Sequence, residues 1–226
     1  MKEVNQSAVP EFVLLGLGHS QDAQVLLFML FLVVYVTTII GNMVIMILVL
    51  TDSHLHSPMY FFLANLSFVD MWLSSVTTPK MIKDFLTENK DISFEGCMCQ
   101  ILFVHFVGGG EMVLLVVMAY DCYVAICKPL HYSTIMGLQR CTGLGVTSWV
   151  VGFVHSIVQL VPNMQLPFFG PREIDNFFCD IPLIIKLACL DTYCLEVLVN
   201  IDSGAITVTC FVLLLIHIYD SHRQTF

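Results

Sequence analysis

The sequence predicts an all-α membrane protein, built as a bundle of transmembrane helices. Of its 226 residues, 57% are hydrophobic and only 12% are charged, whereas a soluble domain carries about 25% charged residues. The chain also contains five stretches with the roughly 20 mostly apolar residues that one membrane-spanning helix needs. We predict spans at residues 25–50, 58–79, 97–120, 142–160 and 197–218, so that the bundle covers residues 25–218.

Residues 1–24 form a mostly polar tail before the first span. They lack the basic segment and short apolar segment of a cleaved signal peptide, so we expect the first span to act as its own insertion signal. The triplet Asn5-Gln6-Ser7 is an acceptor for N-glycosylation, which favours an extracellular tail modified at Asn5.

We predict that the N-terminus lies outside the cell, on chemical grounds. This orientation places most lysines and arginines outside, so the positive-inside rule points mildly the other way. It also places Cys97 and Cys179 on the same outer side, where an oxidising compartment permits a disulfide.

Three of the predicted spans contain an acid: Asp70 in the second, Glu111 in the third and Asp202 in the fifth. An aspartate inside a span costs about 2.5–3.5 kcal/mol on insertion scales, so each acid is a candidate functional residue. The fourth span is uncharged.

The longest connection, residues 161–196, is rich in proline and predicts an irregular loop rather than a helix.

Several function classes are excluded by what the sequence lacks. No cluster of lysine and arginine indicates nucleic-acid binding, and no cysteine and histidine set has the spacing of a metal site. No arrangement of nucleophile, base and acid predicts an enzyme. No inverted repeat favours a transporter.

Five motifs follow one another along the chain in an order typical of one family. Together they resemble the olfactory receptors, a branch of the rhodopsin-like G-protein-coupled receptors, over about residues 10–216. The motifs are "EFVLLGL" (11–17), Gly41–Asn42, "LHSPMYFFLANLSFVD" (55–70), "MAYDCYVAICKPLHY" (118–132) and "FFCDIPLIIKLAC" (177–189).

The chain also departs from the family pattern. The family has seven spans and the resemblance therefore implies a partial bundle, truncated after the fifth helix. The family's Asp-Arg-Tyr triplet carries Cys122 in place of the arginine, and Phe169 stands where the family usually has a cysteine. Residues 219–226 do not resemble the family's continuation, which predicts an atypical C-terminal tail from a frameshift or premature stop.

The resemblance assigns roles at both ends of the third span. It implies a disulfide between Cys97 and Cys179, and a G-protein coupling motif of Asp121, Cys122 and Tyr123. Arginine supplies five donors and a fixed charge, so its replacement by cysteine is expected to leave Asp121 without its neighbour.

An interior ion site is implied by the resemblance at Asn42, Asp70 and Glu111, with sodium as the ion. The alternative is a protonated, hydrogen-bonded pair of acids without an ion. We expect no other cofactor and no other metal.

A pocket for small, mostly apolar odorants is expected in the outer halves of the third and fifth spans. Alternatively, a histidine here is a satisfied core residue, and the glycines permit close helix packing. The candidate residues are His105, Gly108, Gly109, Asp202, Ser203 and Ile206.

The resemblance implies an odorant receptor in the plasma membrane that signals through the olfactory stimulatory G protein. The partners expected are an odorant, the heterotrimeric G protein and the lipid bilayer, but no nucleic acid. The alternative is a truncated relic that does not signal and is retained in the endoplasmic reticulum or associates with intact receptors. We expect this second outcome for five helices alone, because Asp70 and Glu111 would lack partners.

Overall fold

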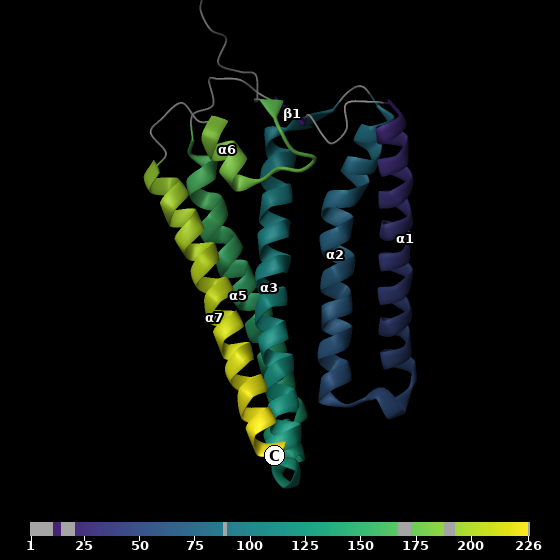
Figure 1. The fold of residues 1–226 in the computed structure, drawn as a ribbon, viewed down its shortest axis with the longest axis vertical. Coiled ribbons are helices and arrows are strands. Elements are labelled where there is room, and N and C mark those ends of the chain that lie inside the picture. Colours follow the sequence, from purple (N-terminus) through teal and green to yellow (C-terminus); the bar gives the residue numbers. More distant parts are fainter. Residues whose placement is uncertain (1–10, 15–20, 88–89, 167–172, 188–192, 226) are drawn as a thin grey trace, which may run out of the picture.

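Five long antiparallel helices make up most of the protein (Figure 1). The computed structural model describes residues 11–14, 21–87, 90–166, 173–187 and 193–225. All five helices are long and apolar enough to cross a membrane, which confirms the predicted fold class. They are α1 (Gln21–Thr51), α2 (Pro58–Leu86), α3 (Phe94–Cys127), α5 (Leu138–Met164) and α7 (Tyr193–Thr225).

Helix α3 is the centre of the bundle and contacts α2, α5 and α7. Helix α1 packs on the far side of α2, so α1 and α2 lie on one side of α3, and α5 and α7 on the other (Figure 1). Short segments connect the helices at the lower end in the figure: η1 (Ser53–Leu55), η2 (Pro129–His131) and α4 (Tyr132–Ile135). We call this the η1 end of the bundle.

The opposite end carries a small sheet, and we call it the sheet end. Strand β1 (Glu11–Leu14) pairs antiparallel with β2 (Asp91–Ser93) and parallel with β3 (Glu173–Ile174). Alternate residues of β1, Phe12 and Leu14, are 1% exposed and belong to the core beneath the sheet. The sequence did not indicate these strands, because runs of two to four residues are too short to show an alternating pattern.

The helices extend beyond the predicted spans. Helix α2 continues through Pro79 to Leu86, since a bundle can satisfy the backbone groups that a proline frees. Helix α7 continues to Thr225, so most of the stretch expected as a tail is helical. The long outer loop is also not wholly irregular, because α6 (Ile181–Leu187) forms within it. Proline is tolerated in the first turn of a helix, where Pro182 lies.

Glycines bring the backbones of α3 and α5 into contact. A Cβ atom added at Gly152 would lie 2.4 Å from the carbonyl oxygen of Phe106 and 2.6 Å from the amide nitrogen of Gly110. A Cβ atom added at Gly109 would lie 3.3 Å from the Cα of Gly152. Small residues of this kind are the usual means by which helices approach closely in lipid.

We predict that Gly152→Ala lowers the stability of the chain by about 1–3 kcal/mol, because the added methyl group meets backbone that cannot move aside. The measurement is the thermal unfolding midpoint of the purified chain in detergent. Gly143→Ala is the matched control on the same helix, since nothing lies within 4 Å of its added Cβ. Equal midpoints for the two variants would contradict the close contact of α3 and α5.

Candidate functional site

A polar network joins α5 to α7 within the half of the bundle nearer the sheet end. The ring nitrogen Nδ1 of His155 donates to Oδ2 of Asp202 over 2.9 Å. The side-chain amide of Gln159 donates to the same carboxylate oxygen over 2.8 Å and lies 3.0 Å from the hydroxyl of Ser203. Asp202 is therefore held by two donors from α5, and its position is set by the packing of α5 against α7.

Two acceptors in this region lack a hydrogen-bond partner among the residues that the structure describes. They are Oε1 of Gln159 and Oδ1 of Asn163, whose side chains are 1% and 0% exposed. The amide nitrogen of Asn163 donates to the backbone oxygen of Gln159 over 2.6 Å. A buried acceptor without a donor is costly, by about 1–3 kcal/mol, so a donor from a bound molecule would be stabilised here.

His105 on α3 extends the network toward the centre of the bundle. Its ring centroid lies 5.8 Å from that of His155. Its Nδ1 lies 3.0 Å from the carbonyl oxygen of Ile101, and a carbonyl only accepts, so Nδ1 carries the proton. In the neutral ring, Nε2 is then a further acceptor.

The other expected pocket residues have different surroundings. A Cβ atom added at Gly109 would lie 3.0 Å from Cδ2 of the His155 ring, so Gly109 does not border open space, whereas nothing lies within 4 Å of a Cβ atom added at Gly108. Ile206 is half-buried on α7. The structure thus brings His105, Asp202 and Ser203 together by way of α5.

Sequence reasoning missed the residues of α5 that join this network. His155, Gln159 and Asn163 recur every four positions, which places them on one face of the helix. The span is otherwise apolar or small on this stretch. Polar residues at every fourth position of an uncharged helix could have indicated a polar face on this helix.

The residues of the expected ion site lie on α1, α2 and α3. Asn42 donates from its side chain to the backbone oxygen of Thr38 over 3.0 Å, within its own helix. Asp70 and Glu111 are half-buried. Within the described ranges, no group of three or more histidine, cysteine or acidic side chains could hold a metal ion.

At the η1 end, Asp121 of α3 is buried, with 2% of its surface exposed. The hydroxyl of Tyr132 donates to its Oδ1 over 2.8 Å. Asp121, which has Cys122 rather than an arginine as its neighbour, therefore has a different partner: the chain turns back after α3 through η2, which brings the Tyr132 hydroxyl to the carboxyl. Burial, and then the hydrogen bond to Asp121, raise the pKa of Tyr132 above its ordinary value.

The other two residues of the triplet differ from Asp121 in their surroundings. Cys122 is an exposed free thiol. The ring of Tyr123 lies 6.4 Å from that of Tyr120 and 5.7 Å from that of His217 on α7. The triplet thus has one buried acid, one exposed thiol and one ring in the contact of α3 with α7.

At the sheet end, a disulfide joins Cys97 in α3 to Cys179 before α6. Gln100 supports it: its side-chain oxygen accepts from the amide of Cys179 over 3.0 Å, while its nitrogen lies 3.3 Å from the backbone oxygen of Val76. The loop is therefore tied to both α3 and α2. Asn5, Phe169 and Cys189 lie outside the described residues, whereas Cys99 is a free thiol.

Comparison with known proteins places these features in a family. A family profile described as olfactory receptor matches residues 31–224. Human olfactory receptor 4K14 is 58% identical over 217 residues, which cover 96% of this chain and 70% of the relative. Human olfactory receptors 4K3 and 4F4 are each 56% identical, over 94% and 92% of this chain and 67% and 68% of their own lengths.

We predict that Tyr132→Phe destabilises the η1 end, because it leaves a buried carboxyl without its donor. The expected loss is about 1–3 kcal/mol, measured as a lower thermal unfolding midpoint in detergent. Tyr219→Phe removes the same hydroxyl from a tyrosine that is 65% exposed and serves as the control. A loss of equal size in both variants would argue against a structural role for the Tyr132–Asp121 bond.

Proposed function

This chain belongs to the olfactory receptor family, and we propose that it binds odorants beside the polar network of α3, α5 and α7 and signals through a stimulatory G protein. It is an odorant receptor and a multi-pass membrane protein. The members of its family are receptors rather than enzymes. The location of the site is inferred from the hydrogen bonds around Asp202 and from the two unpartnered acceptors on Gln159 and Asn163.

The chemistry of the network favours an odorant with a hydrogen-bond donor, such as an alcohol. Oε1 of Gln159 and Oδ1 of Asn163 are buried acceptors without a donor among the described residues. The side chains around them on the same helices are largely apolar, which suits a small hydrophobic body. An alcohol would satisfy an acceptor with its hydroxyl while the rest of the molecule stays in apolar surroundings.

We propose that the sheet end faces outward and the η1 end faces the cytoplasm, in the plasma membrane. The disulfide between Cys97 and Cys179 supports this, because disulfides persist in oxidising compartments. The G protein would then meet the chain at Asp121 and its neighbours.

Signal transfer follows from a shift between two arrangements of the helices. An odorant that binds one arrangement more tightly raises its population. The bond from Tyr132 to Asp121 restrains the cytoplasmic end of α3 in the arrangement seen here. Cys122 cannot add the charge that the family's arginine would supply, so Tyr132 carries this restraint.

A sodium ion is a further part of the proposal. Hard cations prefer oxygen ligands, and Asp70 and Glu111 are half-buried carboxyl groups on the neighbouring helices α2 and α3. We expect sodium chloride to raise the unfolding midpoint more than choline chloride does at the same concentration. Asp70→Asn should abolish that difference, and a difference that persists in this variant would exclude the site.

We predict an odorant-dependent rise in cyclic AMP when the full chain is expressed with the olfactory stimulatory G protein and tested against a broad odorant panel. Gln159→Leu should weaken the response to an active alcohol about tenfold in effective concentration, since one hydrogen bond contributes about 1 kcal/mol or slightly more. The response to an active odorant without a hydroxyl should change less.

The controls separate binding from folding and transport. Gln139→Leu makes the same change at an exposed position of α5 and should leave the response unaltered. Surface staining in parallel shows whether each variant reaches the plasma membrane. Surface display without a ligand-dependent rise would contradict the proposed receptor function, and an unchanged response in Gln159→Leu would contradict the location of the site.

A further inference from the structure

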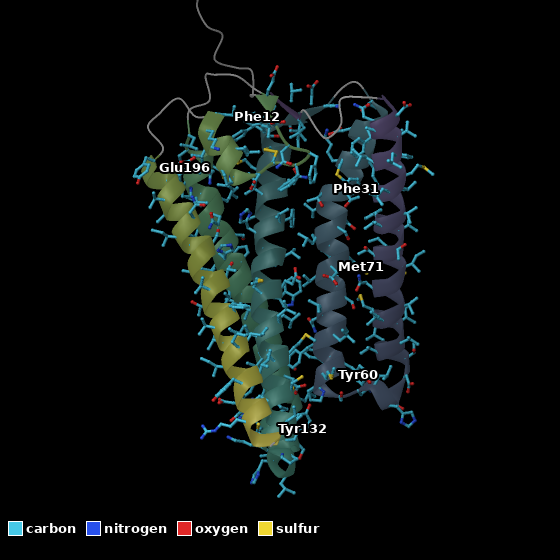
Figure 2. The ribbon with its side chains drawn as sticks, in the orientation of Figure 1. Phe12, Phe31, Tyr60, Met71, Tyr132 and Glu196 are labelled. Atoms are coloured by element: carbon cyan, nitrogen blue, oxygen red, sulfur yellow. A yellow bond between two sulfur atoms is a disulfide. The ribbon has the colours of Figure 1, made fainter. Side chains whose placement is uncertain are left out.

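A small pocket lies between α6 and α7 at the sheet end of the bundle. Its volume is about 260 Å³, slightly below the roughly 300–1,000 Å³ of pockets for drug-sized ligands, so it suits a smaller molecule. Figure 2 places Glu196, one of its lining residues, at the same end of the bundle as Phe12. The side chains of the polar network around Asp202 do not line it. The lining residues are Pro182, Ile185, Lys186, Glu196, Val199 and Asn200.

Two facing helix surfaces form the walls of this pocket. The lining residues of α6 are spaced by three and four positions along the helix, and those of α7 have the same spacing. Residues at this spacing share one face of a helix. The disulfide between Cys97 and Cys179 fixes the chain just before α6, so one wall of the pocket is covalently tied to α3.

The base of the pocket is apolar. Ile185 and Val199 are buried, and both belong to the core beneath the sheet. Pro182 adds a further apolar surface from the first turn of α6. A ligand with a small hydrocarbon group would cover these side chains and exclude water from them.

The two walls carry opposite charges. Lys186 on α6 is exposed, and Glu196 on α7 is half-buried. Within the part of the chain that the structure describes, neither side chain forms an ion pair. Asn200 lies one turn after Glu196 and adds an amide oxygen, which accepts hydrogen bonds.

This charge pattern selects a ligand that carries both charges. A carboxylate without an amino group would be attracted by Lys186 but repelled by Glu196, and an amine without a carboxylate would meet the reverse. A direct ion pair between two partly exposed side chains contributes little, so a ligand that pairs with both can take its place.

We propose that this pocket binds a free α-amino acid with a small apolar side chain, such as leucine. The carboxylate of the ligand accepts from the ammonium group of Lys186. Its own ammonium group donates to the carboxylate of Glu196 and to the amide oxygen of Asn200, while its side chain packs on Ile185 and Val199. This site goes beyond the proposed odorant function and does not depend on it.

The first test compares three ligands on the unaltered full chain, purified in detergent. Ligand-observed NMR measures each dissociation constant, with empty micelles as the reference. We expect leucine to bind at least tenfold more tightly than 4-methylpentanoate, which lacks the amino group, and than isoamylamine, which lacks the carboxylate. This comparison needs no variant and is therefore independent of any folding defect.

The second test removes one charge at a time. Lys186→Gln and Glu196→Gln should each weaken leucine binding at least tenfold. Because Glu196→Gln removes the repulsion of a carboxylate, it should bind 4-methylpentanoate at least as tightly as the unaltered chain does. Lys186→Gln should likewise keep its affinity for isoamylamine, which shows that the pocket is intact.

Three matched variants should leave leucine binding unchanged. Glu95→Gln changes an exposed acid in the first turn of α3, as Glu196 lies in the first turn of α7. Lys83→Gln changes an exposed lysine of α2. Gln159→Leu alters the proposed odorant site and leaves this pocket as it is.

Circular dichroism and the Cys97–Cys179 disulfide report on folding in each variant. Leucine binding that is no tighter than that of either analogue would overturn the site, as would unchanged leucine binding in a folded Lys186→Gln or Glu196→Gln chain. Loss of leucine binding in Gln159→Leu would place the amino acid at the odorant site and overturn the proposal as well. None of these outcomes alters the cyclic AMP response to odorants, which tests the proposed function separately.

Discussion

The close contact of α3 with α5 at Gly109, Gly110 and Gly152 is the constraint on which the other features depend. Helices in lipid gain little from the hydrophobic effect when they associate, so backbone proximity and interhelical hydrogen bonds determine their packing. Because the two backbones touch here, His155 of α5 lies beside His105 of α3. The same packing orients the polar face of α5 toward α7, where Asp202 accepts its hydrogen bonds.

At each end of the bundle an acid is held by hydrogen bonds: Asp202 is half-buried and Asp121 is buried. Asp202 is held by donors from α5, and Asp121 by the hydroxyl of Tyr132. A carboxylate away from water is costly unless it is hydrogen-bonded, so each acid fixes the element that supplies its donor. At the sheet end this arrangement positions a candidate odorant site. At the η1 end it restrains the region proposed to meet the G protein.

The bilayer is the solvent that makes unpaired polar groups unfavourable in this molecule. A cavity beside Tyr132 and the polar network lie at opposite ends of the bundle, and α5 contributes residues to both.

The sequence by itself determined the membrane class, the five spans and the family, because hydropathy over about 20 residues and ordered motifs are local properties. It also singled out Asp202, since acids within a span are costly, and the family resemblance singled out Asp121. It did not indicate the partners of these acids. His155 and Gln159 are more than forty positions from Asp202 along the chain, and Tyr132 reaches Asp121 only through the turn after α3. Only the tertiary structure decided these pairings, the three short strands and the cavity, because each depends on how helices distant in sequence pack against one another.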